Sequence, residues 1–332
     1  MQRLTYDEVL EATGGRVLFG KHNGVEGISI DSRTVGPKDF FLALKGERFD
    51  GHDFVGQALE KCAGAIVSIP PVSPPSNKTI IHVGSTLKAL QDIAHYIRKK
   101  YGPQVLGITG SNGKTTTKEM SAHILSGKLS VLKNTGNLNN HIGLPLSMLE
   151  LGGHHEAMVL EMGASAPGDI KKLCGIAEPD FGVLTNIGLA HIEGFKDIAT
   201  VRKAKMELLD LVGLAAVNLD DEFLMEGVAV AVYQGRLLRF GLGEGADIRA
   251  TDVELGQKDT SFVLHIPGGE VPVRLGLTGM FNVYNALAAA SAAYMFGISA
   301  EDVKEGLESF KGVPMRLELK DMRGYTIISD VY

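Results

Sequence analysis

The stretch that most constrains this chain is Val105–Met120, which reads VLGITGSNGKTTTKEM. An apolar run leads into a turn rich in glycine, and Lys114 follows the turn together with three consecutive threonines. This order of strand, loop and helix is that of a phosphate-binding loop, in which backbone N–H groups and the positive end of the helix face phosphate oxygens. Lys114 would neutralise the β- and γ-phosphates, and a threonine hydroxyl would bind Mg²⁺. The stretch therefore predicts that the chain binds ATP or GTP.

The glycines of this loop depart from the usual spacing. The strict pattern has a glycine five residues before Gly113, where this chain has Ile108, and its glycines stand at Gly107 and Gly110 instead. An ordinary glycine-rich turn is the alternative interpretation. Packing alone does not explain Gly-Lys followed by three threonines at the end of a strand, so we favour the phosphate-binding loop.

The hydrophobic pattern predicts an α/β fold. The order strand, loop, helix repeats from residue 105 to residue 220, which predicts a doubly wound, mostly parallel sheet. Short alternating strands from about residue 228 to residue 277 predict an antiparallel flap on the same domain. Short strands and helices ahead of the loop predict a small N-terminal α/β domain.

Length and pattern together divide the chain into domains. We expect an N-terminal domain over residues 1–83, a central ATP-binding domain over residues 84–313 and the start of a further domain over residues 314–332. A chain of 332 residues is long enough for two or three domains. Because the sequence stops inside what reads as a strand, we expect a third domain to be missing.

Composition excludes several classes of partner. A net charge of −6 gives no support for nucleic-acid binding. Cys62 and Cys174 lie far apart among apolar residues, which predicts buried thiols in a reducing compartment. The N-terminus carries Arg3, Asp7 and Glu8 and is no secretory signal, and no apolar run is long enough to span a membrane. We expect a cytoplasmic protein, without nucleic-acid or membrane partners, that is a monomer.

Polar side chains follow the predicted strands of the central sheet. Glu161 ends an apolar strand over residues 157–161, and His191 lies just beyond a strand over residues 181–186. Ligands bind at the carboxyl ends of strands in open parallel sheets, and a carboxylate there can hold Mg²⁺ beside a phosphate-binding loop. Lys203 and Lys205 lie on a following amphipathic helix, where the residues alone indicate solvated side chains.

Two further polar segments are candidates for ligand contacts. Asn134, Asn137, Asn139 and Asn140 fall within seven residues, a density that suits sugar, base or peptide contacts but also an asparagine-rich turn. Ser32 and Arg33 lie in a polar turn between two short strands of the N-terminal region. Ligand binding and plain turn formation both remain open for the loops of that region.

Several motifs of this chain resemble the Mur ligases, the ATP-dependent amide-forming ligases of peptidoglycan precursor synthesis. In the order of the chain these motifs are DSRTVGPKDFFLALKGERFDGHDF, GITGSNGKTTTKEM, NTGNLNNHIGLPLSML, LEMGASAPGDI, TNIGLAHIEGF and FNVYNALAAA. The resemblance covers essentially all 332 residues. It implies a uridine-nucleotide-binding N-terminal domain and a C-terminal Rossmann-like domain after the central one.

One branch of the family fits these motifs better than another. SNGKTTTKEM, GNLNNHIGLP and MGASAPGDI together resemble the branch that adds D-alanyl-D-alanine to UDP-N-acetylmuramoyl-tripeptide. The branch that adds lysine or diaminopimelate usually reads TGTNGKTT, with a Thr-Thr-Pro segment in place of GNLNN. Another ligase of this type, a poly-amino-acid synthetase, and a non-catalytic nucleotide-binding module are the alternatives.

The resemblance implies a reaction through an acyl phosphate. ATP phosphorylates the carboxylate of the UDP-linked peptide, the amine of D-alanyl-D-alanine attacks, and phosphate leaves from a tetrahedral intermediate. Positioning and charge neutralisation carry most of such a reaction. In the family a C-terminal domain supplies the site of the amine substrate. If the chain ends at Tyr332, we therefore expect weak ATP binding, retained precursor binding and no ligase turnover.

The resemblance also implies roles for individual residues, with ATP and Mg²⁺ as cofactors. The catalytic residues that it implies are Lys114, His191 and Lys205. Mg²⁺ would be held by Thr115, Glu161, His191 and Lys205, the last as a carbamate, with Lys203 as the competing assignment. ATP would be bound by Gly110, Ser111, Asn112, Gly113, Lys114, Thr115, Thr116, Asn282, Asn285, Arg316 and Asp330. The peptide precursor would be bound by Ser32 and Arg33 at its nucleotide, and by Asn137 and Asn140.

Overall fold

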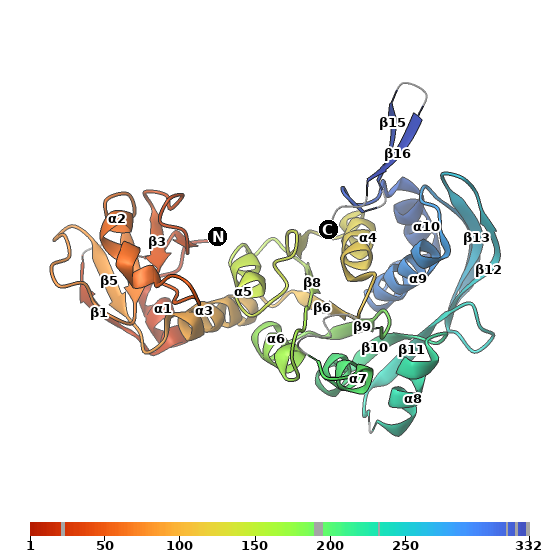
Figure 1. The fold of residues 1–332 in the computed structure, drawn as a ribbon, viewed down its shortest axis with the longest axis horizontal. Helices are drawn as coiled ribbons and strands as arrows, with labels where there is room; N and C mark the ends of the chain where they lie inside the picture. Colours follow the sequence, from red (N-terminus) through yellow and green to blue (C-terminus); the bar gives the residue numbers. More distant parts are fainter. Residues whose placement is uncertain (21–23, 189–194, 232, 317, 323–324, 330–332) are drawn as a thin grey trace. The chain divides into compact units, whose positions relative to one another are not determined.

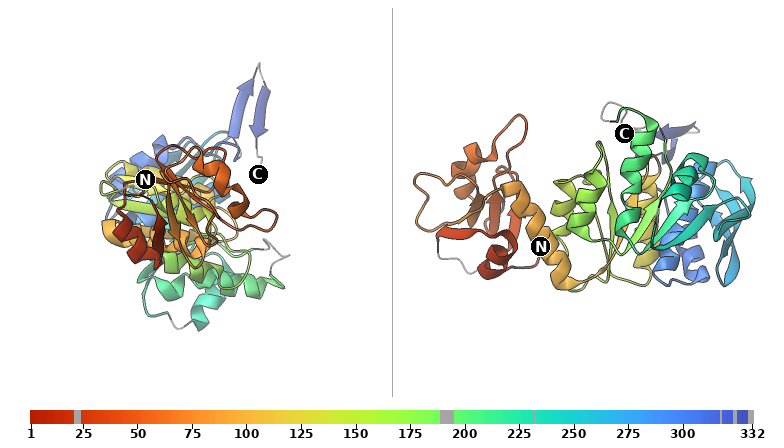
Figure 2. Two further views of the ribbon diagram at one scale, coloured as in Figure 1. Left: turned by 90° about the vertical axis from the view of Figure 1, so that its left-hand side faces the viewer. Right: turned by 90° about the horizontal axis from the view of Figure 1, so that it is seen from below.

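The computed structural model of the chain describes residues 1–20, 24–188, 195–231, 233–316, 318–322 and 325–329. Two compact units make up the chain (Figures 1 and 2). Unit 1 comprises Met1–Gly102 and His141–His154, and unit 2 comprises Pro103–Asn140 and His155–Tyr332. None of the helices among the described residues is long and apolar enough to cross a membrane.

Unit 1 is a small α/β domain built on a five-stranded sheet. Its strand order is β1-β5-β4-β3-β2, with bounds Arg16–Phe19, Thr79–His82, Gly64–Val67, Asp39–Leu42 and Gly27–Ser29. All neighbours are parallel except β1, which pairs antiparallel with β5. The small N-terminal α/β domain expected from the sequence is thus confirmed, and its core includes Phe41, Leu59 and Ile80.

The described residues of unit 1 form four α-helices. They are α1 (Tyr6–Thr13), α2 (Val55–Leu59), α3 (Thr86–Tyr101) and α5 (Gly143–Met148), and a 3₁₀ turn over Gly51–Phe54 precedes α2. A capping box between Thr5 and Glu8 starts α1. Helix α3 packs against α1 and α5. The predicted boundary after residue 83 would place α3 in the central domain, whereas by its contacts it lies in unit 1; the domain limits themselves stay a prediction.

Unit 2 is organised around a nine-stranded sheet. Its order is β14-β13-β12-β11-β10-β9-β6-β8-β7. In chain order the strands are β6 (Gln104–Thr109), β7 (Val131–Lys133), β8 (Ala157–Glu161), β9 (Phe181–Leu184), β10 (Leu214–Asn218), β11 (Arg236–Gly241), β12 (Ile248–Leu255), β13 (Thr260–Ile266) and β14 (Gly269–Leu275). Neighbours from β7 to β12 are parallel, so the predicted doubly wound sheet is confirmed.

The antiparallel part continues this sheet and is smaller than predicted. Strand β11 lies parallel to β10, and β12 begins parallel to β11. Among the described strands of this sheet, the antiparallel pairs are β12 with β13 and β13 with β14. Polar and apolar residues do not alternate clearly over residues 236–241, so the sequence does not show whether this strand is parallel or antiparallel. The predicted change from parallel to antiparallel strands was therefore placed too early.

Helices cover both faces of the central sheet (Figure 1). One face carries α4 (Lys114–Ser126), α9 (Met280–Met295) and α10 (Ala300–Ser309), and the other carries α6 (Asp169–Ala177), α7 (Ile198–Met206) and α8 (Glu222–Val230). Alanines make up much of α9, and Ala286, Ala289 and Ala293 are fully buried. Small side chains let α9 pack closely against α4, and both helices contact the sheet, α4 at β6, β7 and β8 and α9 at β9 to β13.

After α10 the chain forms a two-stranded hairpin. Strand β15 (Glu318–Met322) pairs antiparallel with β16 (Tyr325–Ser329). The sequence predicted a strand at the end of the chain, and β16 confirms it. Figure 1 and the left view of Figure 2 show the hairpin standing away from the nine-stranded sheet.

Candidate nucleotide-binding site

The predicted phosphate-binding loop lies between β6 and α4. Strand β6 ends at Thr109, and α4 begins at Lys114. Gly113 has φ +79°, and a Cβ there would lie 2.3 Å from Oδ1 of Asn285. A larger residue at this position would therefore have an unfavourable backbone conformation, and its Cβ would clash with Asn285 of the neighbouring helix. Glycine lets α4 start at the end of the loop with its first N–H groups directed out of the helix.

Hydrogen bonds fasten the loop to the segment after β9. The backbone N–H groups of Ser111 and Asn112 donate to the carbonyl and the side-chain oxygen of Asn186, each at 2.9 Å. The Ser111 hydroxyl donates to Gly188 O at 2.9 Å and accepts from Gly188 N at 2.8 Å. Because two N–H groups of the loop serve these internal bonds, the N–H groups that open α4 are the ones left to face a phosphate.

Two lysines reach the carbonyl groups of this loop. The Nζ atom of Lys114 donates to Ser111 O at 2.9 Å, and Nζ of Lys205 donates to Gly110 O at 2.8 Å. Lys205 comes from α7 and is 1% exposed, whereas Lys203 on the same helix is exposed. The structure thus brings Lys205, and not Lys203, to the phosphate-binding loop.

Burial changes the proton affinity of both lysines. The pKa of Lys205 falls to about 7, mainly because burial disfavours its charged form and also because the positive charge of Lys114 lies near. Burial likewise lowers the pKa of Lys114, an effect that the carboxylate of Glu161 opposes and the charge of Arg316 reinforces. Arg316 therefore lies within electrostatic reach of Lys114.

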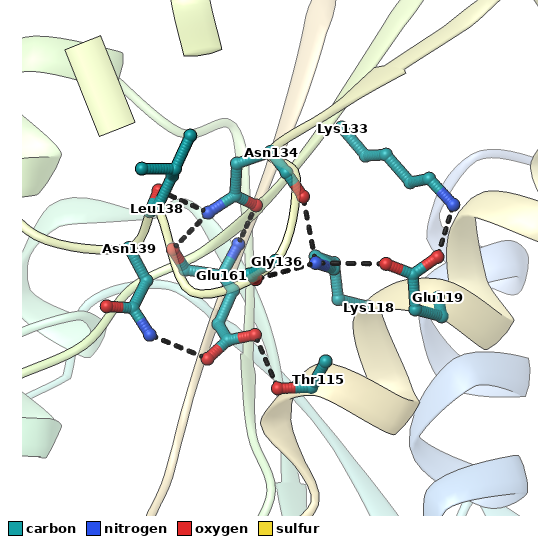
Figure 3. A network of polar contacts seen from close by, with 9 residues as sticks. All are labelled: Thr115, Lys118, Glu119, Lys133, Asn134, Gly136, Leu138, Asn139 and Glu161. Atoms are coloured by element: carbon teal, nitrogen blue, oxygen red, sulfur yellow. Dashed lines mark hydrogen bonds and ion pairs between the residues drawn. The ribbon is translucent and has the colours of Figure 1, made fainter. Parts of the chain in front are cut away.

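Glu161 ends β8 beside the first turn of α4 and is 2% exposed (Figure 3). Its Oε2 atom accepts a hydrogen bond of 2.8 Å from the hydroxyl of Thr115, and its Oε1 atom accepts one of 2.8 Å from Nδ2 of Asn139. A hydroxyl and a carboxylate in contact provide hard oxygen ligands of the kind that Mg²⁺ prefers.

These oxygens fit a magnesium ion that is bound together with a nucleotide. In the part of the chain that the structure describes, no three His, Cys, Asp or Glu residues gather as a metal site. Mg²⁺ typically uses one or two carboxylates and takes its remaining ligands from phosphates and water. Glu161 and Thr115 would supply the protein's share of such a site.

Asn282 and Asn285 lie in the first turns of α9, next to the loop. Oδ1 of Asn285 accepts a bond of 3.4 Å from the Thr117 hydroxyl, and its Nδ2 donates to Oδ1 of Asn282 at 3.3 Å. Asn282 in turn donates to Thr278 O at 2.9 Å. Both asparagines are buried, so they stiffen the junction between α9 and the phosphate-binding loop.

The other predicted residues lie elsewhere or outside the described residues. Asn137 and Asn140 are exposed in the loop after β7, and Thr116 is half-buried in the first turn of α4. His191 and Asp330 lie outside the described residues.

Ser32 and Arg33 belong to unit 1. Ser32 is buried, and Arg33 is exposed. The Arg33 guanidinium binds the Asp31 carboxylate with two bonds, Nε–Oδ1 at 2.9 Å and Nη2–Oδ2 at 2.7 Å. This guanidinium lowers the pKa of Asp31 to about 2. The Arg33 side chain is thus exposed and its guanidinium is oriented by Asp31.

Sequence reasoning missed Lys118 and did not single out Asn134 and Asn139 from the four candidate asparagines. Asn134, Asn139 and Lys118 contact Glu161 or the loop beside it. The dense run of asparagines pointed to this loop, but it did not say which of the four side chains face the strand end. Lys118 follows the three threonines and reads as an ordinary helix lysine, although it is fully buried.

Comparisons with known proteins agree with this geometry. The sequence matches the Mur ligase middle domain over residues 108–293 and the Mur ligase family catalytic domain over residues 24–98. It is 40% identical over 316 residues to the UDP-N-acetylmuramoyl-tripeptide–D-alanyl-D-alanine ligase of Bacillus subtilis, which covers 93% of this chain and 67% of the relative.

Solved structures of related ligases also resemble this chain. A crystal structure of MurF from Acinetobacter baumannii superposes with a TM-score of 0.95 at 36% identity and covers 100% of this chain and 74% of that chain. The crystal structure of MurF ligase from Thermotoga maritima in complex with ADP gives a TM-score of 0.83 at 34% identity, covering 92% of this chain and 71% of that one. The chain belongs to the Mur ligase family.

Proposed function

We propose that this chain serves the ATP-dependent joining of D-alanyl-D-alanine to UDP-N-acetylmuramoyl-tripeptide, through an acyl phosphate, in peptidoglycan precursor synthesis. The observation that carries the proposal is the convergence of Lys114, Glu161 and Lys205 on one phosphate-binding loop. The relative from Bacillus subtilis, at 40% identity, carries the name of this ligase. The solved structures at 34–36% identity support the same branch of the family.

The residues of the loop would bind and orient the nucleotide. The first N–H groups of α4 and the ammonium of Lys114 would bind the phosphates, because both present positive charge at the end of β6. Thr115 and Glu161 would hold Mg²⁺, and Arg316 would add positive charge beside Lys114. Bound Mg²⁺·ATP supplies the phosphoryl group that activates the substrate carboxylate. Positioning and charge neutralisation are then the main contributions of the chain.

Lys205 would act as a carbamate. A lysine must lose its proton before its amine can attack carbon dioxide, and a pKa of about 7 leaves a large neutral fraction at neutral pH. The amine nitrogen would form a C–N bond to carbon dioxide while the electron pair of one C=O π bond moves to oxygen and the nitrogen releases one proton. The resulting carbamate would share a single negative charge between two oxygens. Such a group would attract Mg²⁺, whereas an ammonium repels it. Burial and position support Lys205 over Lys203.

The remaining roles follow the family. Asn282, Asn285 and Asp330 would bind the nucleoside of ATP, and His191 would help hold a second Mg²⁺. In unit 1, Ser32 and Arg33 would bind the uridine nucleotide of the precursor, and Asn137 and Asn140 of unit 2 would contact substrate or ATP. We further infer a cytoplasmic monomer that binds no nucleic acid, which its acidic net charge and its use of ATP support.

Two alternative functions are less well supported. A related ligase for another amino acid would share the central site, but the motifs and the relatives' names favour the D-alanyl-D-alanine branch. A nucleotide-dependent switch would need the phosphate-binding loop, but it would not need a buried lysine in contact with that loop. The contact of Lys205 with Gly110 is therefore the feature that favours a ligase over a switch.

Carbon-13 NMR tests the ligase against the switch. The protein is equilibrated with ¹³C-bicarbonate at pH 8, and carbamate carbon signals are recorded for the wild type, Lys205→Met and Lys203→Met. We expect a carbamate signal that Lys205→Met removes and that Lys203→Met, the control on the exposed face of the same helix, retains. A wild-type spectrum whose carbamate signals all persist in Lys205→Met would contradict the proposal.

A further inference from the structure

A fully buried lysine lies one turn beyond the phosphate-binding loop and has no part in the chemistry above. Lys118 in α4 is 0% exposed. Its Nζ atom donates to Asn134 O at 2.8 Å and to Gly136 O at 3.4 Å, and it lies 3.0 Å from a carboxylate oxygen of Glu119 (Figure 3). Lysine is almost never fully buried unless its charge is paired, because desolvation of an ammonium is costly. A buried ammonium at this place therefore indicates a specific task.

The ion pair with Glu119 does not define that task. Lys133 also binds the Glu119 carboxylate, so this acid has a second cation (Figure 3). Burial raises the pKa of Glu119, but the hydrogen bonds from Lys133 and Lys118 outweigh it and leave the pKa below its usual value. The two carbonyl groups that Lys118 binds both belong to the loop after β7. Lys118 therefore attaches the main chain of this loop directly to α4.

The loop in turn holds the backbone of Glu161. Asn134 is fully buried, and its Oδ1 atom accepts from Glu161 N at 2.9 Å. Its Nδ2 atom donates to Glu161 O at 3.1 Å and to Leu138 O at 2.8 Å. One side chain thus joins the end of β8 to both ends of the loop, and Lys118 binds the main chain of the same residue.

The far end of the loop holds the Glu161 carboxylate. Nδ2 of Asn139 donates to Oε1 at 2.8 Å, opposite the bond from Thr115 to Oε2. Asn139 O accepts from Gly163 N at 2.8 Å, and a Cβ at Gly163 would lie 2.8 Å from Oδ1 of Asn139. Gly163 therefore permits the close approach that places Asn139 against the carboxylate.

We propose that Lys118 is a positioning residue for Glu161, acting through the loop 134–139 and its residues Asn134 and Asn139. The inference rests on the proposed function in one respect, that Glu161 faces Mg²⁺ bound with a nucleotide. Groups that orient a metal-binding carboxylate raise metal affinity by fixing its rotamer in advance. Loss of Lys118 would free the loop and with it the Asn139 contact. Lys114 and the start of α4 bind phosphate from other atoms and would be unaffected.

Calorimetric titration with ADP separates an effect of Lys118 on metal binding from an effect on phosphate binding. Each protein is titrated once with MgCl₂ present and once with EDTA, and the ratio of the two affinities measures the contribution of the metal. We expect Lys118→Met and Asn139→Ala to lower this ratio by about 10- to 100-fold. ADP affinity in EDTA should stay within about twofold of the wild type. Lys133→Met is the matched control, since its ammonium binds Glu119, and it should keep the wild-type ratio.

Several results would overturn the inference. A folded Lys118→Met protein with the wild-type ratio would show that this lysine only fills space. Equal losses with and without Mg²⁺ would show that it supports the phosphate-binding loop as a whole. If Lys118→Met does not fold, Lys118→Gln, which keeps an amide donor, and Asn139→Ala decide: wild-type ratios in both overturn the inference. A wild-type protein that binds no ADP would instead overturn the proposed function.

Discussion

At the scale of single residues, the chain places two lysine side chains in positions that disfavour their charge, and each placement has a consequence. The Nζ atom of Lys118 has three oxygen partners, a carboxylate oxygen of Glu119 and the carbonyl oxygens of Asn134 and Gly136. Lys205 has a single carbonyl acceptor at Gly110 and the positive charge of Lys114 nearby. The partners of Lys118 suit a structural contact, whereas the surroundings of Lys205 favour its neutral amine.

The pKa of Lys205 predicts a pH-dependent stability. Its pKa is about 7 in the folded protein against 10.5 for an ordinary lysine. Between pH 7 and pH 10.5 the unfolded chain binds more protons at this residue than the folded protein does, so the free energy of unfolding rises with pH. Below about pH 7 the destabilising effect of this residue has its full size. We expect Lys205→Met to be more stable than the wild type by about 2–4 kcal/mol at pH 6, and the difference should shrink at pH 9.

Urea unfolding in carbonate-free buffer at the two pH values measures this difference. Lys203→Met is the control, because that lysine is exposed and its removal should leave the pH dependence unchanged. A Lys205→Met protein that is less stable than the wild type at pH 6, or that keeps the wild-type dependence on pH, would contradict the account.

At the scale of elements, α7 carries Lys205 and is held in place from two sides. Its first turn is capped by Asp197, whose carboxylate accepts from Thr200 N at 2.7 Å. At its end Glu207 caps the neighbouring helix α6, accepting from Gly168 N at 2.7 Å and Lys171 N at 3.0 Å. The carboxylate also faces the positive end of the α6 dipole. Glu207 thus ties the Lys205 helix to the segment that follows Glu161.

Removal of this cap should loosen both helices. We expect Glu207→Ala to lower the free energy of unfolding by about 1–2 kcal/mol, the range found for lost N-caps. The measurement is chemical denaturation, with Glu226→Ala as control, since that exposed acid on α8 pairs with Arg202 at 3.3 Å and should contribute less than 1 kcal/mol. Equal stabilities of Glu207→Ala and the wild type would show that the contact between α6 and α7 does not depend on this cap.

The same elements show how far the sequence predicts the site. The loop Val105–Met120, the strand ending in Glu161 and the helix of Lys205 were all predicted, because parallel strands bring their carboxyl ends to one edge. The choice between Lys203 and Lys205 stayed open, although Val201, Ala204 and Leu208 mark the buried face that also includes Lys205. Asn134 and Asn139 could not be separated from Asn137 and Asn140. Their roles depend on the path of the loop, which spacing does not define.

At the scale of the whole molecule, the chain combines two compact units with different tasks. Unit 2 holds the phosphate-binding loop and the three groups that converge on it, and unit 1 presents Arg33 on its surface. The chain spans 67% of the Bacillus subtilis relative and 74% of the Acinetobacter baumannii structure. The division into units could not be predicted in detail, because α3 and α5 join unit 1 through packing between segments far apart in the sequence.

The measurement that tests the central claim most directly is calorimetric titration with UDP-N-acetylmuramoyl-tripeptide. The account predicts micromolar binding, at least tenfold weaker binding of the corresponding dipeptide precursor, and a loss of at least tenfold in Arg33→Ala. Lys38→Ala is the matched control, since this exposed lysine of unit 1 pairs with Glu26 at 3.2 Å and should leave the affinity unchanged. Absence of tripeptide binding by a protein that still binds Mg²⁺·ADP would contradict the claim and leave a nucleotide-binding protein with a different substrate.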